Sequence, residues 1–204
     1  IKNLPKFNLI IHCAAEPAIE VSQRDIDSVF KINLVGTLNI LKKCSKDRSK
    51  MIFLSTMRVY SINKLIDTFK ERKLINENFS VESAKSIYGY SKFSSEMLIK
   101  EFAYLKNIKY IINRLAVTTG PWQFGKSEQG FVSLWIWNHF NKKKLTYNGW
   151  GGKGKQIRDI IHIDDFCELI LLQIKRINKI NNITFNVGGG RKNKIDLKDL
   201  TKIC

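Results

Sequence analysis

The chain has 204 residues, with 35 lysines and arginines against 18 acidic residues, a formal net charge of +17 and 44% hydrophobic residues. Its apolar runs are short, and none reaches the roughly 18 residues that cross a bilayer, which excludes a membrane-spanning helix. The basic residues are dispersed, and 142–144 is the longest basic run, whereas proteins that bind nucleic acid cluster their charge and interleave aromatic residues. We therefore expect neither a nucleic-acid nor a membrane partner, and instead a small anionic substrate.

The termini and the cysteines bear on location and metal content. The chain begins without methionine and shows no secretory signal, so we expect a cytoplasmic protein whose natural start lies upstream. The four cysteines form no CxxC pair and have no metal-ligand spacing. We expect reduced, buried thiols and no metal site.

The first half of the chain alternates between apolar runs and segments of helical spacing. Residues 8–13 and 50–54 read as buried strands, residues 22–46 as helical, 86–105 as a helix and 109–117 as a third strand. This order of strand, helix, strand, helix, strand is typical of βαβ units. The sequence therefore predicts an α/β fold with a Rossmann-like, doubly wound parallel sheet.

The second half of the chain differs in composition from the first. Residues 121–156 hold all four tryptophans and a glycine-rich stretch, and we expect Trp135 and Trp137 to lie in a helix as packing or interface residues. A strand at 158–163, a helix at 164–174, a strand at 184–190 and a helix capped by Asp196 follow. We expect a partial cofactor-binding domain at 1–119, a mainly substrate-binding region at 120–183, a strand returning to the first sheet at 184–190, and the start of a substrate-domain helix at 191–204.

Two tyrosine–lysine pairs have the spacing Tyr-x-x-x-Lys. Tyr88 and Lys92 open a predicted helix, so both side chains lie on one helical face. Tyr60 and Lys64 lie in a predicted loop, and with so many lysines in the chain we interpret that pair as a chance match. In doubly wound sheets ligands bind at the carboxyl ends of the strands, which is where Thr56 and the neighbouring small residues fall.

Six segments, taken in order, resemble the extended short-chain dehydrogenase/reductase family of nucleotide-sugar epimerases and dehydratases. They are "IIHCAAEPAIEVS", "INLVGTLNIL", "FLSTMRVY", "YGYSK", "GKQIRDIIHIDD" and "FNVGGG". Within the family, "GPWQFGKSEQGFVSLW" followed by "GKGKQIRD" looks most like the CDP-paratose 2-epimerase (CDP-tyvelose epimerase) branch. The resemblance covers nearly the whole chain.

The resemblance implies an NAD cofactor, a nucleotide-diphosphate sugar as substrate, and a homodimer. It assigns catalysis to Thr56, Tyr88 and Lys92. The cofactor contacts that it implies are Ala14, Ala15, Tyr88, Lys92 and Val117, and the substrate contacts are Thr56, Arg58, Gln123, Gln129 and Arg158. Free tyrosine has a pKa near 10, and we expect the ammonium group of Lys92 to lower the pKa of Tyr88 toward that of a working base.

One family element is missing. The glycine-rich turn GxxGxxG, which holds the NAD pyrophosphate at a helix N-terminus, has no counterpart in the 204 residues. We therefore expect a fragment that lacks the N-terminal glycine-rich region and the C-terminal tail, and that is inactive by itself.

Three functions remain open at this point. The first is an NAD-dependent nucleotide-sugar epimerase that works by transient oxidation to a keto-sugar. The second is a 4,6-dehydratase or a reductase of the same family, although Met57 and Arg58 stand where dehydratases carry Asp-Glu. The third is a non-catalytic basic binding protein on a Rossmann-like scaffold.

Overall fold

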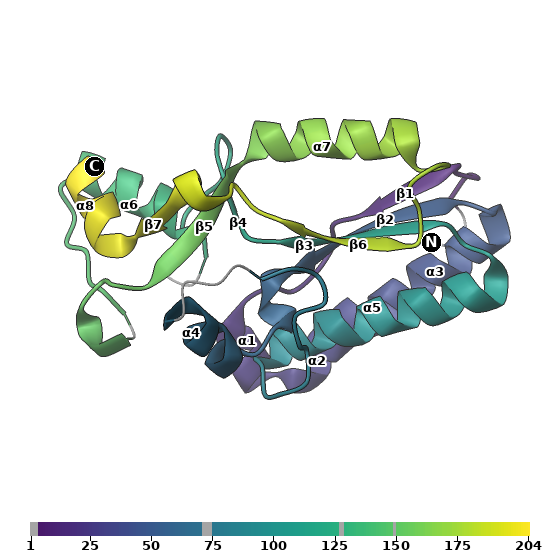
Figure 1. The fold of residues 1–204 in the computed structure, drawn as a ribbon, viewed down its shortest axis with the longest axis horizontal. Coiled ribbons are helices and arrows are strands. Elements are labelled where there is room, and N and C mark those ends of the chain that lie inside the picture. The colour runs from purple at the N-terminus through teal and green to yellow at the C-terminus, as the bar shows by residue number, and fades with distance from the viewer. Residues whose placement is uncertain (1–3, 71–74, 127–128, 149) are drawn as a thin grey trace. The chain divides into compact units, whose positions relative to one another are not determined.

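The computed structural model describes residues 4–70, 75–126, 129–148 and 150–204. The fold divides into two compact units, which are described separately (Figure 1). Unit 1 comprises Ile1–Leu115 and Leu172–Asn186, and unit 2 comprises Ala116–Leu171 and Val187–Cys204.

Unit 1 holds most of the strands and helices predicted for the first half of the chain. In chain order they are β1 (Leu9–His12), α1 (Ile19–Arg24), α2 (Ile26–Phe30), the π-helical turn η1 (Lys31–Val35), α3 (Gly36–Asp47), β2 (Lys50–Thr56), the 3-10 turn η2 (Met57–Val59), α4 (Ile62–Lys70), α5 (Ile87–Lys106) and β3 (Tyr110–Leu115), joined by the end of α7 (Ile163–Arg176) and most of β6 (Ile183–Val187).

The strands of unit 1 form a sheet of order β1-β2-β3-β6 within the described residues. β1 pairs with β2 and β2 with β3 in parallel, with Ile52 opposite both Ile11 and Ile111. Parallel neighbours need crossover connections, and α3 and α5 supply those between β1, β2 and β3. The predicted α/β class with a doubly wound parallel sheet is confirmed.

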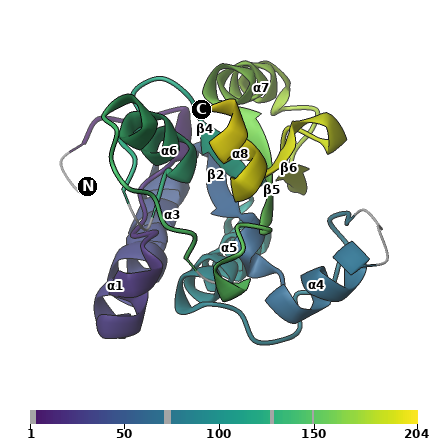
Figure 2. The same cartoon turned by 90° about the vertical axis from the view of Figure 1, so that its left-hand side faces the viewer.

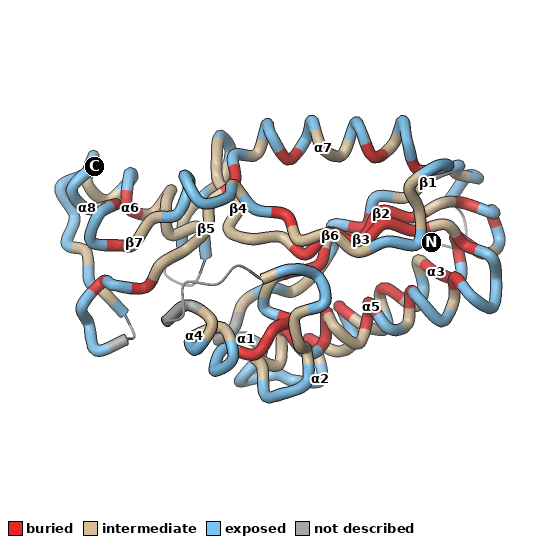
Figure 3. Tube along the Cα trace, viewed as in Figure 1, coloured by how far each residue is buried: buried red, intermediate tan, exposed pale blue. Residues whose placement is uncertain are grey.

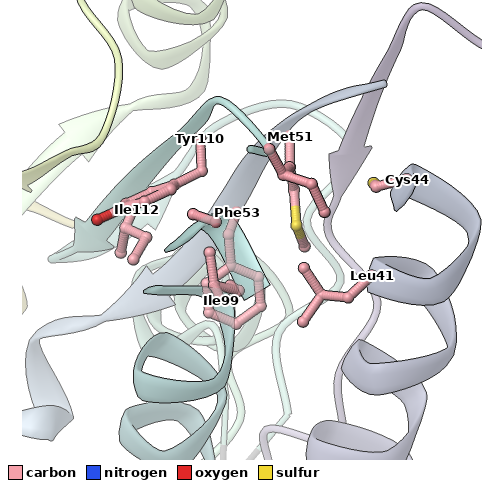
Figure 4. Close-up of a cluster of buried hydrophobic side chains, with 9 residues drawn as sticks. Leu41, Cys44, Met51, Phe53, Ile99, Tyr110 and Ile112 are labelled. Carbon is pink, nitrogen blue, oxygen red and sulfur yellow. The ribbon is translucent and has the colours of Figure 1, made fainter. Parts of the chain in front are cut away.

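Side chains on a strand alternate between the two faces of the sheet, and unit 1 uses both faces. Met51 and Phe53 of β2 join Ile112 of β3 against α3 and α5, and Figure 4 shows this cluster with Leu41 and Ile99. On the opposite face Asn113 of β3 exchanges two hydrogen bonds of 2.8 Å with Gln173 of α7. The buried positions concentrate on β2 and β3, while α5 alternates between buried and exposed residues (Figure 3).

The predicted helical segment 22–46 is interrupted twice. Asp25 leaves the helical conformation and caps α2, because its carboxylate accepts a hydrogen bond of 2.9 Å from the Ser28 N–H. The chain then passes through η1, where Asn33 is buried, before α3 begins at Gly36. π-helical turns of this kind often mark functional positions.

The structure differs from the predicted elements in two further places, at the end of the predicted strand 109–117 and in the segment after β2. The predicted strand 109–117 ends at Leu115, and Val117–Thr119 form β4, which pairs with a different sheet. Helix α4 follows η2 and was not predicted from the sequence. Its apolar residues Ile62, Leu65 and Ile66 recur at the i, i+3 and i+4 spacing of a one-faced helix.

Unit 2 is built on a sheet of order β4-β5-β7 within the described residues. Its elements are β4 (Val117–Thr119), α6 (Phe131–Phe140), η3 (Trp150–Gly152), β5 (Ile157–His162), most of α7, η4 (Arg191–Asn193), β7 (Lys194–Asp196) and α8 (Leu197–Ile203). β4 runs parallel to β5, and β7 runs antiparallel to it.

Helices α6 and α8 pack on each other in unit 2 (Figure 2). Trp135 is buried against Leu197 and Leu200, and its indole N–H donates to the Thr201 hydroxyl at 2.9 Å. Trp137 is 59% exposed. The prediction of a packing residue is therefore confirmed for Trp135, which faces α8, whereas an interface role for the exposed Trp137 stays a prediction.

Candidate active site

Strand β2 ends at Thr56, one of the predicted catalytic residues. The apolar residues Met51–Leu54 bury the strand, and the Thr56 hydroxyl accepts a hydrogen bond of 3.2 Å from the Arg58 N–H. This bond begins the short turn η2. Thr56 is thus held at the carboxyl end of a central strand, where parallel α/β sheets bind their ligands.

Helix α5 presents the predicted tyrosine and lysine. Ser86 caps the helix, since its hydroxyl accepts a hydrogen bond of 3.1 Å from the Gly89 N–H. Gly89 lies so close to the carbonyl group of Arg58 that a Cβ atom there would sit 2.9 Å from the carbonyl carbon. The first turn of α5, with Tyr88, therefore packs directly on η2, next to Thr56.

The phenol of Tyr88 interacts with both Thr56 and Arg58. Burial raises the pKa of Tyr88, while a hydrogen bond with the Thr56 side chain and the positive charge of Arg58 act to lower it. The sequence predicted a pKa lowered by the Lys92 ammonium group. In the structure the cation acting on the phenol is Arg58, and burial outweighs it, so the predicted direction is wrong for the protein without ligand.

Lys92 lies one turn further along α5 and is only 2% exposed. Its ammonium nitrogen sits 3.9 Å from the centroid of the Phe53 ring, a favourable cation–π position. Burial lowers the pKa of Lys92 to about 8, against the opposing charges of Glu96 and Cys13. At neutral pH most Lys92 side chains therefore still carry a proton.

The end of β1 lies close to the same lysine. The ring of His12 is 5.4 Å from that of Phe53. The Thr37 hydroxyl donates to the Asn33 carbonyl at 2.5 Å, so its oxygen accepts from Nε2 of His12 at 3.0 Å. Burial, with a smaller contribution from the Lys92 charge, lowers the pKa of His12 to about 4. His12 is therefore neutral at physiological pH.

We expect the neutral state of His12 to make folding stability depend on pH. The unfolded chain takes up a proton near pH 6.5 and the folded chain only near pH 4, so stability is full above 6.5 and declines as the pH falls toward 4. A difference of this size corresponds to roughly 3 kcal/mol. Urea unfolding between pH 7 and 4 should show that His12→Gln removes this part of the decline.

His162→Gln is the matched control, because His162 is a half-exposed histidine of unit 2. It should keep the pH dependence of the unsubstituted protein. An unchanged decline in His12→Gln would contradict the assignment of the pH dependence to His12.

The predicted cofactor contacts after β1 are small residues at the surface. Ala14 is exposed and Ala15 is half-buried. Neither has a side chain that would obstruct a flat ligand lying against the strand end. Their exposure agrees with a role in contact, which remains a prediction.

The remaining predicted contacts belong to unit 2. Val117 begins β4. The Gln123 amide donates to the Thr118 carbonyl at 2.9 Å and accepts from the hydroxyls of Thr119 and Ser133 at 3.1 and 3.0 Å. These bonds give Gln123 a structural role that joins β4 to α6. A substrate contact through the same amide would have to compete with them.

Gln129 and Arg158 complete the predicted set. Gln129 is exposed and pairs through its backbone with Lys126. Arg158 lies in β5, and its guanidinium group donates to the Ile157 carbonyl at 2.8 Å. The carboxylate of the next residue, Asp159, accepts from the N–H groups of Gly189 and Gly190 at 2.8 and 3.0 Å.

Unit 2 also contains a cavity of about 210 Å³, lined by residues 118–123 and Ile163. Among the described residues, the buried Thr118 hydroxyl has no hydrogen-bond partner. An unpartnered buried hydroxyl is uncommon.

The second tyrosine–lysine pair has other partners. The Tyr60 hydroxyl accepts from Arg114 at 2.7 Å and donates to Asn186 at 2.8 Å, whereas the Lys64 ammonium group donates to Ser80 at 2.8 Å. These contacts agree with the interpretation of this spacing as a chance match.

Two buried polar residues close to the site were not predicted. Asn33 in η1 accepts from the Glu16 N–H at 2.7 Å and donates to the Ser91 hydroxyl at 2.9 Å, which ties the loop after β1 to α5. Glu96 follows Lys92 by four residues and is fully buried. The spacing of Tyr88, Lys92 and Glu96, four residues apart each time, was visible in the sequence and could have identified Glu96.

The other expectations concern cysteines, metals and membranes. Cys44 is buried, but Cys13, Cys167 and Cys204 are exposed, and all four are free. The expected burial is therefore wrong for three of them, which lie on loop or surface positions. In the described part of the chain no group of three or more His, Cys, Asp or Glu side chains could hold a metal ion, and no helix is long and apolar enough to cross a membrane.

Comparison with known proteins finds epimerases and dehydratases that are named for nucleotide sugars. The chain is 26% identical over 208 residues to the CDP-paratose 2-epimerase of Salmonella typhi, covering 94% of this chain and 60% of that protein. It is 28% identical over 188 residues to the dTDP-D-glucose 4,6-dehydratase of Dictyostelium discoideum, covering 90% of this chain and 41% of that protein. It therefore spans about 60% or less of the length of these relatives.

A solved structure shows the same fold. The UDP-glucose 4-epimerase of Thermotoga maritima, determined with UDP-glucose, matches with a TM-score of 0.79 and 28% identity over 96% of this chain and 59% of that one. Residues 1–188 match the model of the NAD dependent epimerase/dehydratase family. With this match over most of its length, the chain belongs to the NAD dependent epimerase/dehydratase family.

Proposed function

We propose that the complete gene product is an NAD-dependent nucleotide-sugar epimerase that oxidises one sugar carbon to a ketone and reduces it again from the opposite face. The observation that carries this proposal is the packing of the first turn of α5 on η2, with Gly89 against the Arg58 carbonyl. This packing brings the Tyr88 phenol to the Thr56 hydroxyl at the end of a parallel strand. Lys92 lies one turn further along the same helix.

The residues present suit an NAD nicotinamide riboside. Within the described residues, nothing accepts a hydrogen bond from the buried Lys92 ammonium group, which is left facing the Phe53 ring. Hydroxyl groups of a ribose would supply acceptors for it. Tyr88, Lys92, the exposed Ala14 and the half-buried Ala15 would hold this part of the cofactor. Val117 is also a proposed cofactor contact. The bound cofactor supplies a hydride acceptor that later returns the hydride.

Tyr88 is the proposed general base. Its phenol takes the proton of the sugar hydroxyl as the carbon is oxidised, and it gives a proton back when the ketone is reduced. Thr56 orients that hydroxyl through its own side chain. The positive charge of Arg58 favours the phenolate over the phenol, and together with the hydrogen bond to Thr56 it opposes the burial that raises the pKa of Tyr88.

The two residues after Thr56 favour epimerisation over dehydration. Elimination of water needs an acid and a base beside the sugar, and neither the thioether of Met57 nor the guanidinium group of Arg58 titrates in the useful range. We propose Arg58 as a substrate contact, because it faces Tyr88 from η2. Arg158, whose planar guanidinium group can bind phosphate oxygens bidentately, is the proposed diphosphate contact, with Gln123 and Gln129 as further contacts.

We propose CDP-paratose as the substrate and C2 as the inverted carbon. Support comes from the segments "GPWQFGKSEQGFVSLW" and "GKGKQIRD" and from the similarity to the CDP-paratose 2-epimerase of Salmonella typhi. We further propose that residues 1–119 serve mainly the cofactor and residues 120–183 mainly the sugar nucleotide, and that the complete protein is a homodimer.

We also infer that residues 1–204 are inactive by themselves. They contain no glycine-rich turn of the GxxGxxG type, and the pyrophosphate of NAD would lack the backbone N–H groups that such a turn provides. Calorimetric titration with NAD should show binding to the complete gene product and little or none to this chain. Equal affinities would contradict this inference.

Proton NMR in deuterated water tests the function. The complete gene product is incubated with CDP-paratose and catalytic NAD. Inversion at C2 with the C2 proton retained would support oxidation and reduction at one carbon, whereas exchange with solvent would point to proton abstraction. Turnover of UDP- or dTDP-sugars alone would keep the mechanism and overturn the choice of CDP-paratose.

Two other readings predict different results with other substrates. A reductase of this family would consume NADH stoichiometrically with a keto-sugar nucleotide. A dehydratase would release water from dTDP-glucose, which carries the C6 hydroxyl that CDP-paratose lacks, and form a 4-keto-6-deoxy sugar; the similarity to the Dictyostelium dTDP-D-glucose 4,6-dehydratase is the reason to look for that product. A non-catalytic basic scaffold would turn over no nucleotide sugar, and it would bind nucleic acid with a steep salt dependence.

A further inference from the structure

Behind the Tyr88/Lys92 site lies a buried ion pair that catalysis by these residues does not itself explain. Glu96 of α5 is 0% exposed and Arg114 of β3 is 4% exposed. Nη2 of Arg114 donates to one carboxylate oxygen at 2.7 Å, and Nε lies 3.1 and 3.2 Å from the two oxygens. The pair thus has the bidentate geometry of strong arginine–carboxylate contacts.

Hydrogen bonds extend the pair to three other segments of unit 1. The hydroxyl of Ser55, the residue before Thr56, donates to the Glu96 carboxylate at 2.5 Å. Arg114 also donates to the Tyr60 hydroxyl at 2.7 Å, and Tyr60 donates to Asn186 of β6 at 2.8 Å. The Glu96 carboxylate is therefore fixed from β2 and β3, and cannot turn away from its position on α5.

Stability is a weak reason for such a pair. Removing two charges from water is costly, and well-packed apolar residues of similar volume often replace a buried ion pair without loss. The location of this pair is more informative. Glu96 follows Lys92 by one helical turn on the same buried side of α5, the spacing at which helical side chains interact.

In the described part of unit 1, the groups that act on Lys92 come from three segments. On α5 it has Glu96, on the segment after β1 it has the thiol of Cys13 and the neutral ring of His12, and on β2 it has the Phe53 ring. Of these, Glu96 and Cys13 raise the pKa of Lys92, and Glu96 is the larger influence. A cysteine thiol is mainly neutral at pH 7, so Glu96 is the lasting negative charge.

We propose that Glu96 is a positioning residue that acts through Lys92: its carboxylate, held in place by Arg114 and Ser55, supplies the counter-charge that keeps the buried ammonium group protonated at neutral pH. The ion pair with Arg114 fixes the position of the Glu96 carboxylate. The part of the carboxylate's negative charge that Arg114 does not cancel acts on the Lys92 ammonium group. The contribution of this charge to catalysis rests on the function proposed above. The effect of the Glu96 charge on the protonation of Lys92 does not depend on that function.

The test measures the protonation of Lys92 directly. The complete gene product is labelled with 13Cε-lysine, and the Lys92 signal is identified by its absence from Lys92→Arg. In the unsubstituted protein we expect a titration midpoint near 8. Glu96→Gln keeps the shape and the hydrogen-bond acceptor but removes the charge, and it should lower the midpoint by about one pH unit, as the loss of a neighbouring opposite charge does.

Asp47→Asn is the matched control. Asp47 is also a buried carboxylate in an ion pair, 2.6 Å from Lys43 on α3, and its loss should leave the Lys92 midpoint unchanged. Because Glu96→Gln leaves Arg114 unpaired and could unfold the protein, Glu96→Leu combined with Arg114→Leu provides a second variant without the carboxylate. That variant should show the lowered midpoint as well.

An unchanged midpoint in a folded variant of either kind would overturn the proposal. A lowered midpoint in a protein that turns over no nucleotide sugar would support the effect of Glu96 on Lys92 while contradicting the proposed function. Failure of this proposal and failure of the proposed function are therefore distinguishable. A purely structural role for Glu96 would lower the melting temperature without moving the midpoint, which would also overturn the proposal.

Discussion

Tyr88→Phe in the complete gene product should lower the turnover number for sugar inversion by about 10²–10⁴-fold, the usual contribution of one general acid–base group. The substitution removes a single oxygen atom. Substrate affinity should change little, because the ring that Tyr88 places beside Thr56 and Arg58 is retained. The measurement is proton NMR of the sugar with saturating substrate, together with the dissociation constant of the nucleotide sugar by calorimetry.

Tyr90→Phe is the control for this prediction. Tyr90 lies on the same helix, two residues away, but its side chain is 51% exposed and contacts the Phe30 ring. It should retain the turnover of the unsubstituted protein. Turnover by Tyr88→Phe within a few-fold of that control would remove Tyr88 from its proposed role.

Gly89→Ala should be the most damaging small substitution in α5. Alanine normally favours a helix over glycine by about 1 kcal/mol. Here the added methyl group would meet the backbone carbonyl of Arg58 well inside contact distance. Because the obstacle is backbone and not a flexible side chain, it cannot simply move aside. Overpacking of this kind typically costs about 1–3 kcal/mol, so we expect a net loss of unfolding free energy, measured in urea.

The same substitution should also impair catalysis. To make room, the first turn of α5 and η2 must separate, which moves the Tyr88 phenol away from Thr56. A displacement of about 1 Å between reacting groups can lower a rate by about 10²-fold. We expect a loss of this order in kcat, measured by the NMR assay on folded protein at a temperature below its transition.

Gly36→Ala provides the matched comparison. Gly36 begins α3 with helical backbone angles, and a Cβ atom there would meet nothing closer than the Lys31 carbonyl oxygen at 3.9 Å. That substitution should be neutral or stabilise the protein by a few tenths to about 1 kcal/mol. Equal effects of the two substitutions would show that the contact with Arg58 does not limit residue 89.

The sequence by itself determined the elements whose signals are local. The mainly apolar segments at 50–54 and 109–117 predicted two strands of the sheet, since a buried parallel strand is apolar on both faces. Ser86 and the spacing that follows it predicted α5. The order of six motifs predicted the family, and with it the choice of Thr56, Tyr88 and Lys92, because those residue types occur at fixed positions relative to strand and helix ends.

The tertiary structure decided which charges and polar groups meet. Glu96 and Arg114 are 18 residues apart, Asn33 and Ser91 are 58 apart, and Tyr60 and Asn186 are 126 apart. No local pattern reports such pairs. The same holds for the cation beside Tyr88: helical spacing pointed to Lys92, but the packing of η2 against Gly89 brought Arg58 there instead.

The division of residues 109–119 into two strands has the same origin. The sequence predicts one strand over 109–117, but β3 takes its partners from the first sheet and β4 from the second. Strand identity depends on the hydrogen-bonded neighbour, and that neighbour comes from a distant part of the chain. Local sequence sets which segments are strands and helices, whereas burial and the pairing of distant segments set the pKa values and contacts on which the chemistry depends.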